Sequence, residues 1–396
     1  MTRSPAVLPG DDCCRWKGVY CGNITGHVVK LDLRGTDCES SDGSMQVHVL
    51  AGKISSSLLG LQHLRYLDLS CNRFDKIEIP EFLGSLHKLR YLDLSWSQLI
   101  VGRIPPQLGN LSNLQYLNLE ATSYSTDITW LSRLTSLEHL DMSVVNLSAT
   151  VHWLQGVNML PNLKVLRLSQ CQLRSSPDSL QLSNLTSLET LDLSGNGFIK
   201  GSMPNWFWEL TSLKYLYIAD NGFYGPFPDK IGNITSMVEL DLSNINFVGM
   251  IPSNMKNLCN LESLYFHSNN INGSITELFH RLPSCSWNKL QYLVLSDSNL
   301  TGSLPTTLVQ PLSNLSVLDL TDNNLTGHVP LWIGKLAKLK ELDLSFDNLD
   351  GVIDEGYLSS LDMLEILELS YNSIAITFSP TWVPPFSLTI IHLGSC

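Results

Sequence analysis

The residues of this chain best suited to chemistry are carboxylates that recur at one position of a repeated phrase. Carboxylates are common general acids and bases, but such a pair needs two groups in distinct environments. Copies of a single repeat position do not supply that difference, and no nucleophile–base set or phosphate-binding loop accompanies them. We therefore interpret the carboxylates as structural and predict that the protein is not an enzyme. The recurring residues are Asp32, Asp68, Asp93, Asp141, Asp192, Asp241, Asp319 and Asp343.

Cysteine and histidine are the other candidates for chemistry. The ten histidines are scattered, and the chain has neither a C-x₂-C pair nor an H-E-x-x-H motif, so we predict no metal site and no cofactor. The odd number of cysteines, nine, predicts at least one free or intermolecular thiol in a secreted chain. They are Cys13, Cys14, Cys21, Cys38, Cys71, Cys171, Cys259, Cys285 and Cys396.

A repeated sequence motif of the form L-x-x-L-x-x-L-x-L-x-x-N positions these residues. It returns about fifteen times between residues 27 and 396, with clear copies at Leu61–Asn72 and Leu185–Asn196, and the last copy is incomplete. The spacing of about 24 residues is typical of an α/β leucine-rich repeat solenoid, in which each unit buries its apolar face against its neighbours. We expect a curved right-handed superhelix with a parallel β-sheet on its concave face. Short 3₁₀ or helical turns and second short strands should lie on the convex face.

Each repeat alternates inward leucines with outward polar residues, as Leu67 and Leu69 do around Asp68. An asparagine three residues after the last strand leucine should satisfy backbone groups of the adjacent turns. Cys171 and Cys396 replace it within the pattern, whereas Val145 and Ile245 do not fit and predict less regular turns. The asparagines at this position are Asn72, Asn196, Asn221, Asn269, Asn323 and Asn372.

Composition narrows the possible partners and compartments. The net charge of −12 argues against a nucleic-acid binder, and no apolar run is long enough to span a membrane. The first ten residues lack the apolar stretch of a secretory signal. N-x-S/T sequons suggest glycosylation in a secreted chain, although they also arise freely in repeats rich in Asn, Leu, Ser and Thr. Their asparagines are Asn23, Asn110, Asn146, Asn184, Asn233, Asn272, Asn299, Asn314 and Asn324.

Two further motifs carry a family resemblance. Six repeats continue with G-x-I-P or a close variant, as at Gly102–Pro105, and Asp12–Cys21 reads DCCRWKGVYC. Together they resemble plant extracellular leucine-rich repeat receptor-like proteins, and the phrasing at Leu258–Leu261 and Leu282–Leu290 is most similar to receptors that sense fungal elicitors. The resemblance implies the extracellular face of the plasma membrane or the apoplast. It also implies that the chain is truncated at both ends, without its signal peptide and membrane helix.

The resemblance also implies a domain organisation and a disulfide. Residues 1–10 would be a disordered remnant and residues 11–26 a partial cap, followed by repeats that carry a loop insertion at 35–50. In the family, Cys14 pairs with Cys21 while Cys13 pairs with an upstream cysteine that this chain lacks. From their places beside one strand and its turn, Cys259 and Cys285 form a second expected pair; the alternative is two small buried thiols. We expect Cys71 and Cys171 to be unpaired.

Outward strand positions are the candidate ligand contacts, because exposed aromatic residues on a rigid sheet are good anchors. A tyrosine column could instead pack on itself along the strands. The candidates are Tyr66, Tyr91, Trp96, Tyr116, His139, Tyr215, Tyr217, Tyr265, His267, Tyr292 and Phe346.

These residues lead to two functional hypotheses. The first is the ligand-recognition ectodomain of a plant immune receptor-like protein, which binds a peptide or protein, microbial in origin, and signals through partner receptor kinases. The alternative is a secreted inhibitor of cell-wall-degrading enzymes, similar to plant polygalacturonase inhibitors. Those inhibitors have about ten repeats between two cysteine caps, whereas this chain has about fifteen and shows no second cap. The resemblance and the repeat count favour the receptor.

Overall fold

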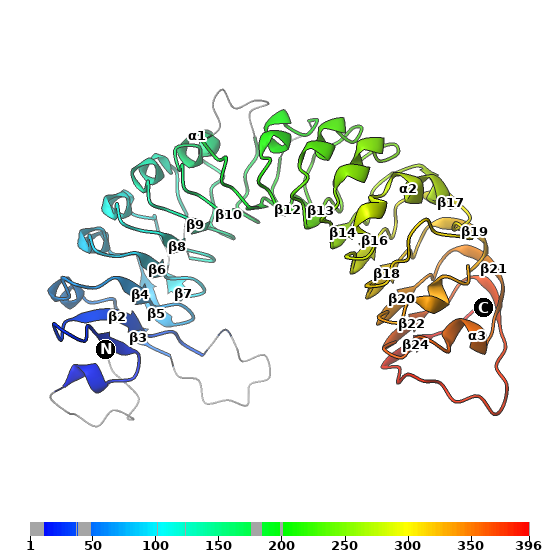
Figure 1. Ribbon diagram of the computed structural model, residues 1–396. Helices are drawn as coiled ribbons and strands as arrows, with labels where there is room; N and C mark the ends of the chain where they lie inside the picture. Colours follow the sequence, from blue (N-terminus) through cyan, green and yellow to red (C-terminus); the bar gives the residue numbers. More distant parts are fainter. Residues whose placement is uncertain are drawn as a thin grey trace. The chain divides into compact units, whose positions relative to one another are not determined.

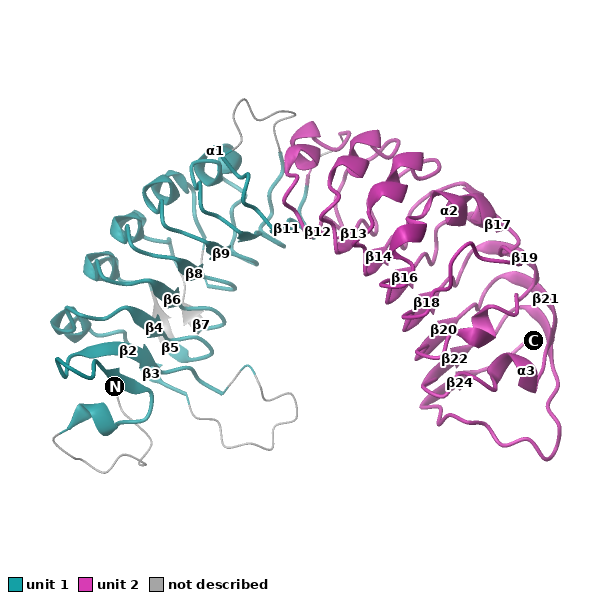
Figure 2. Ribbon diagram, in the orientation of Figure 1, with its two compact units in different colours: residues 1–197 teal, residues 198–396 magenta. Residues whose placement is uncertain are grey.

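The computed structural model describes residues 12–36, 38, 49–100, 102–122, 124–175, 184–198 and 201–395, although it leaves the side chains of residues 75–77 and 98–100 undescribed. Two compact units divide the chain, Met1–Gly197 and Phe198–Cys396, and we call them unit 1 and unit 2 (Figure 2). Most of the insertion expected at residues 35–50 and the remnant at residues 1–10 lie outside the described residues.

Unit 1 is built on a sheet to which each repeat contributes one short strand (Figure 1). The first two strands pair antiparallel, and every later described pair is parallel and in register, as where Leu67 lies beside Leu92. The strands, in sheet order, are β1 (Val19–Cys21), β2 (Val28–Asp32), β4 (Tyr66–Asp68), β6 (Tyr91–Asp93), β8 (Tyr116–Asn118), β9 (His139–Asp141), β10 (Val165–Arg167) and β11 (Thr190–Asp192).

Unit 2 repeats this plan with parallel strands in matching register, as where Leu318 lies beside Leu342. Parallel pairing at one strand per repeat confirms the predicted leucine-rich repeat solenoid. The strands are β12 (Tyr215–Tyr217), β13 (Glu239–Asp241), β14 (Ser263–Tyr265), β16 (Tyr292–Val294), β18 (Val317–Asp319), β20 (Glu341–Asp343), β22 (Ile366–Glu368) and β24 (Ile390–His392).

Second short strands follow the main strands, as expected. Unit 1 has β3 (Ala51–Gly52), β5 (Arg73–Ile77) and β7 (Gln98–Ile100) in one small sheet. Unit 2 has β15 (Gly273–Ser274), β17 (Leu300–Gly302), β19 (Asn324–His328), β21 (Asn348–Ile353) and β23 (Ser373–Ile376) in another.

Helical turns cover the side of each unit opposite its main sheet (Figure 1). Prolines precede several of these turns as extended N-cap residues, and Pro106 occupies the first position of its turn, where its ring already holds a helix-compatible φ. The α-helices are α1 (Trp153–Val157), α2 (Ile275–Arg281) and α3 (Glu355–Leu358). The 3₁₀ turns are Cys13–Arg15, Ser56–Gly60, Glu81–Ser85, Pro106–Asn110, Thr129–Arg133, Asn205–Glu209, Asp229–Asn233, Ser253–Asn257, Ser284–Ser286 and Ile333–Lys335.

The predicted asparagine holds the turn after several main strands. Asn196 donates its amide N–H groups to the carbonyls of Leu168 and Leu193, both at 2.8 Å, and its Oδ1 accepts from the Leu173 N–H at 3.0 Å. The same side chain therefore joins two repeats and satisfies backbone groups that the stacking buries. Asn72, Asn269, Asn323 and Asn372 make the same set of contacts.

Other side chains take this role where asparagine is absent. The Cys171 thiol donates to the Met142 carbonyl at 3.0 Å, and the Ser298 hydroxyl donates to the Phe266 carbonyl at 3.0 Å. At Val145 and Ile245 the buried side chain is apolar, yet Val144 and Asn244 keep the left-handed backbone found in the other turns. The expectation of irregular turns at these positions is therefore wrong for the backbone. Apolar packing of Val145 and Ile245 replaces the side-chain hydrogen bonds made elsewhere.

Asp347 occupies the asparagine position after β20. Its Oδ1 accepts from the Leu325 N–H at 2.7 Å, as an asparagine oxygen would. Its buried Oδ2 has no hydrogen-bond partner among the described residues. Burial raises the pKa of this carboxyl to about 8, and the charges of Asp322 and Asp343 add to the rise. The side chain is therefore largely protonated at neutral pH.

Three disulfides tie the described part of the chain, Cys14–Cys21, Cys38–Cys71 and Cys259–Cys285. The first and third are the expected pairs. The expectation that Cys71 is unpaired is wrong, because the insertion after β2 brings Cys38 to the left-handed turn after β4, with 5.4 Å between the two Cα atoms. Among the described cysteines Cys13 and Cys171 are free thiols.

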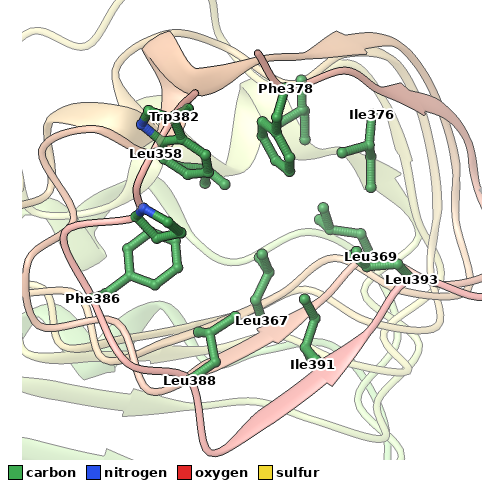
Figure 3. Close-up of a pocket in the computed structure, with 12 residues that line it drawn as sticks. Leu358, Leu367, Leu369, Ile376, Phe378, Trp382, Phe386, Leu388, Ile391 and Leu393 are labelled. Carbon is green, nitrogen blue, oxygen red and sulfur yellow. The ribbon is translucent and has the colours of Figure 1, made fainter. Parts of the chain in front are cut away.

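The described residues contain no helix that is both long and apolar enough to cross a bilayer. Beyond α3, unit 2 has an apolar pocket of about 300 Å³ (Figure 3). Leu367 of β22 and Ile391 of β24 line one side of it, while Trp382 and Phe386 from the intervening segment line another.

Candidate ligand-binding faces

We use the term open face for the side of each main sheet that points away from the leucine core. The outward strand positions form columns on this face, because successive repeats pair in register. Each column therefore places equivalent residues of neighbouring repeats side by side.

The aromatic column on the open face of unit 1 is packed on itself. Tyr66, Tyr91 and Tyr116 stack with ring centroids 4.0 and 4.2 Å apart, and His139 continues the stack at 4.3 Å from Tyr116. The Lys30 ammonium lies 4.0 Å from the centre of the Tyr66 ring and closes that end. The ring faces are therefore occupied within the protein, and only the ring edges and hydroxyls remain for a ligand.

This aromatic stack is coupled to the aspartate column. The hydroxyls of Tyr66 and Tyr91 donate to Asp68 and Asp93, both at 3.3 Å. Burial raises the pKa of Tyr91, and the neighbouring Asp93 charge raises it further. The hydroxyls consequently stay protonated and remain donors over the physiological pH range.

Cations within the protein pair with three carboxylates of this face, Asp32, Asp68 and Asp141. Arg34 reaches the buried Asp68 at 3.4 Å and Asp32 at 3.7 Å. Lys30 pairs with Asp32 at 3.2 Å, and Arg167 lies 3.9 Å from Asp141. The open face of unit 1 thus has aromatic and charged columns whose partners lie in the same unit.

Trp96 stands apart from these columns. It lies in the left-handed turn after β6, with φ of 49° and 51% of its surface exposed. Its indole N–H bonds to Glu120 of the next repeat, and burial raises the pKa of that carboxyl. Trp96 is the one sequence candidate in unit 1 whose side chain is largely open to solvent.

The open face of unit 2 distributes its aromatic residues differently. Tyr265 and Tyr292 lie 6.2 Å apart between ring centroids, and His267 is exposed. Tyr217 hydrogen-bonds to Glu239, whose pKa burial raises. Tyr215 is half-buried on β12. Glu239 and Ser263 stand between Tyr215 and Tyr292 in register, so this column is not a continuous stack of rings like that of unit 1.

A second exposed aromatic pair lies near β22. Phe346 stacks on Tyr371 with centroids 4.3 Å apart, and these rings are 53% and 57% exposed. Sequence reasoning identified Phe346 and missed Tyr371. Tyr371 occupies the same repeat position as Phe346 and Trp96, and comparison of that position across the repeats would have found it.

Among the described residues, the carboxylates near this pair lack the lysine or arginine partners found on the open face of unit 1. Register places Asp319 beside Asp343, and Asp343 beside Glu368, on three adjacent strands. Burial raises the pKa of Asp319 and Asp343, and their negative neighbours raise it further. In the described part of the chain neither of these aspartates nor Glu341 pairs with a lysine or arginine, while Glu368 has His392 at 3.0 Å.

The sequon asparagines lie off both open faces. Asn110 and Asn233 end 3₁₀ turns, and the others fall in the cap or in segments outside the main strands. Asn314 is half-buried, with its amide donating to the Asn288 carbonyl at 2.5 Å, whereas the other sequon asparagines are exposed. Glycans at the exposed positions would leave the sheet faces uncovered.

Metal binding has little support among the described residues. The one group of three potential ligands there is Cys13, Cys14 and Cys21, and two of these form a disulfide.

The fold and these faces define a leucine-rich repeat protein with an open recognition sheet. The family profile described as a leucine-rich repeat region matches residues 44–180 and 140–386. The chain is 34% identical to receptor-like protein EIX1 of Solanum lycopersicum, over 97% of this chain and 44% of that protein. It is 31% identical to receptor like protein 24 of Arabidopsis thaliana, over 96% of this chain and 37% of that protein. The chain belongs to the leucine-rich repeat family and is homologous to plant receptor-like proteins over most of its length.

Solved structures agree with this placement. The ectodomain of the Arabidopsis thaliana receptor kinase GASSHO1/SCHENGEN3, in complex with CASPARIAN STRIP INTEGRITY FACTOR 2, has a TM-score of 0.74 and 30% identity, covering 91% of this chain and 44% of that one. The HAESA ectodomain with an IDA peptide hormone has a TM-score of 0.69 and 30% identity, covering 91% and 65%. The chain spans less than half the length of the two receptor-like proteins above. It is thus related to receptor ectodomains over its own length.

Proposed function

We propose that this chain is the ligand-recognition region of a plant cell-surface immune receptor-like protein. It binds a peptide or protein elicitor of microbial origin on the open faces of its sheets. Signalling then passes through partner receptor kinases. Its location is the extracellular face of the plasma membrane or the apoplast.

The observation that carries this proposal is the set of exposed aromatic residues on an otherwise regular sheet. His267 and Tyr265 replace the serine and aspartate usual at their repeat positions, and Phe346 lies open to solvent. A rigid sheet that presents aromatic groups at low entropic cost is suited to anchoring a protein or peptide. Peptide-bound ectodomains among the structural relatives, and a HAESA complex that also holds the co-receptor SERK1, support the same use of this fold.

The test is a gain of response in plant tissue. The chain is grafted onto the membrane anchor of a receptor-like protein and expressed in leaves, which are infiltrated with fungal or bacterial culture filtrates. We expect at least one filtrate to trigger an oxidative burst that the empty graft does not give. A triple Tyr217→Ala, Tyr265→Ala and His267→Ala variant should lose most of that burst.

A matched variant on the opposite side of the unit provides the control. Asp229 and Lys230 lie in an exposed 3₁₀ turn remote from the open face, and their alanine variants should respond as the unmodified chain does. Equal loss in both variants, or no response to any filtrate in tissue where the graft reaches the cell surface, would contradict the proposal. Inhibition of a fungal polygalacturonase by the purified chain would instead favour the inhibitor hypothesis.

A further inference from the structure

The open face over β18, β20 and β22 holds like charges at the spacing of adjacent strands. Asp319, Asp343 and Glu368 follow one another in register, and Glu341 lies on the same face two residues before Asp343. Like charges directly opposite on neighbouring strands destabilise a sheet. The nearby Lys340 pairs with Glu365 at 3.5 Å, in the next column, and so does not relieve them. Thr321 donates its N–H to Asp319, and Ser345 donates its N–H and hydroxyl to Asp343, so both aspartates have a structural role in their turns. These hydrogen bonds leave the negative charge of the column without a lysine or arginine partner among the described residues.

The stacked pair Phe346–Tyr371 is a second, independent feature of the same repeats. Both residues have left-handed backbone, with φ of 54° and 59°, a conformation that is unfavourable for bulky side chains. At the equivalent turns, earlier repeats of unit 2 have Asp220, Asn244, Ser268, Asp297 and Asp322. Small polar residues suit that turn better, and the exposed rings gain little burial in return. The aromatic pair therefore has a cost in the free protein that a bound partner would offset.

Carboxylates beside exposed aromatic rings match one chemistry, that of the arginine or lysine side chain. A guanidinium forms charge-assisted hydrogen bonds to carboxylates, and its flat face and stem pack on aromatic rings. A bound metal ion fits less well, because among the described residues only the cap cysteines converge as potential ligands. Adjacent strands lie about 4.8 Å apart, and alternate side chains of an extended chain lie about 7 Å apart. A peptide lying across β18, β20 and β22 therefore places two basic side chains over the span from Asp319 to Glu368.

We propose that this surface, formed by Asp319, Glu341, Asp343 and Glu368 with Phe346 and Tyr371, binds a basic, extended segment of the ligand. The inference deepens the proposed function and rests on it. Unit 1 differs, because Lys30, Arg34 and Arg167 pair with Asp32, Asp68 and Asp141, and its tyrosine rings cover one another.

The experiment uses the full chain and two fluorescein-labelled nonapeptides. One alternates arginine with serine, and the other has neutral citrulline in place of every arginine. Fluorescence anisotropy at low ionic strength should show binding of the arginine peptide at least tenfold tighter than that of the citrulline peptide. The Asp319→Asn/Asp343→Asn variant should bind the arginine peptide at least tenfold more weakly than the unmodified chain.

A charge-matched variant of unit 1 separates a local surface from diffuse attraction. Asp93→Asn/Asp192→Asn removes the same charge at the same repeat position, where Asn118 already occurs naturally, and should change the affinity less than twofold. Phe346→Asn/Tyr371→Asn should weaken binding about fivefold, since asparagine tolerates the left-handed turn and the fold is kept. Equal weakening by both aspartate pairs, or equal binding of the two peptides, would overturn the inference.

The leaf assay distinguishes this failure from failure of the proposed function. If a filtrate triggers a burst that the Asp319→Asn/Asp343→Asn graft retains in full, the basic-segment inference is wrong while receptor function stands. If a burst is lost with this variant and kept with Asp93→Asn/Asp192→Asn, both are supported.

Discussion

The open faces of units 1 and 2 are built from the same repeat, yet they arrange charged and aromatic residues in different ways. In unit 1 the aromatic rings cover one another from Tyr66 to His139, and Arg34 reaches the buried Asp68. In unit 2 the Phe346–Tyr371 pair is exposed, and Asp319 and Asp343 lack a cation among the described residues. The repeat thus fixes the scaffold, while the outward residues determine whether a face satisfies its own interactions or leaves them for a partner.

The prediction with the largest expected effect tests whether the repeats of units 1 and 2 are equally stabilised by their turn asparagines, although their open faces differ. Asn196→Ala in unit 1 and Asn269→Ala in unit 2 each remove a buried amide that joins two repeats. We expect each to lower the free energy of unfolding by about 3 kcal/mol, because buried carbonyls and an N–H lose their partners. Chemical denaturation measures the loss, and hydrogen exchange shows whether it stays near the altered repeat.

Asn113→Ala is the matched control for both variants. Its exposed amide makes one contact, to the His87 carbonyl at 2.9 Å, and its loss should be small. A much larger loss from only one of the two buried asparagines would show that the scaffolds differ.

The second prediction concerns Asp347, which gives unit 2 a pH response that the turn asparagines do not have. Its folded pKa of about 8 lies above the ordinary carboxyl value, so the folded state retains a proton that the unfolded state releases. Stability is therefore full below the unfolded pKa and falls as pH rises towards 8, by about 1 kcal/mol per pH unit.

Denaturation at several pH values measures this slope. Asp347→Asn should remove this pH slope and raise stability at neutral pH. The amide does not titrate, and its N–H can donate a hydrogen bond in place of the protonated carboxyl. Asp220→Asn, at an exposed turn of the same unit, should leave the slope in place. A slope unchanged by Asp347→Asn would disprove the assignment.

The third prediction contrasts the aromatic groups themselves. Tyr91→Ala interrupts the stack of unit 1 and should cost about 2 kcal/mol, since both ring faces lose their neighbours. Tyr371→Asn in unit 2 should cost nothing, or stabilise by up to about 1 kcal/mol, because asparagine suits the left-handed turn. Parallel thermal unfolding of the two variants checks the contrast, and equal losses would contradict it.

The smallest expected effect probes charge neutralisation in unit 1. Arg34→Met leaves the buried Asp68 without its cation while keeping an apolar stem, and should cost about 1 kcal/mol. Ser70 still donates to Asp68 through its N–H and hydroxyl, which limits the loss. High salt should reduce the difference between the variant and the unmodified protein, whereas a salt-independent loss would point to packing instead.

The sequence by itself determined the architecture, because the repeat period, the inward leucines and the turn asparagines are local patterns that every copy restates. It also indicated Tyr217, Tyr265 and His267 as departures from the repeat, with Trp96 and Phe346 one position further along. The pairing of Cys38 with Cys71 could not be derived in this way, since an insertion interrupts the period between these cysteines.

The tertiary structure alone decided which aromatic rings are covered and which carboxylates have partners. Tyr66 and Tyr292 occupy the same position of the repeat. A ring at this position is covered only when the neighbouring repeat offers another ring in register. Asp68 and Asp343 likewise share a repeat position, but Asp68 has the Arg34 guanidinium and the Tyr66 hydroxyl as partners from its surroundings. Stacking and ion pairing depend on contacts between repeats, which residue type and spacing within one repeat do not specify.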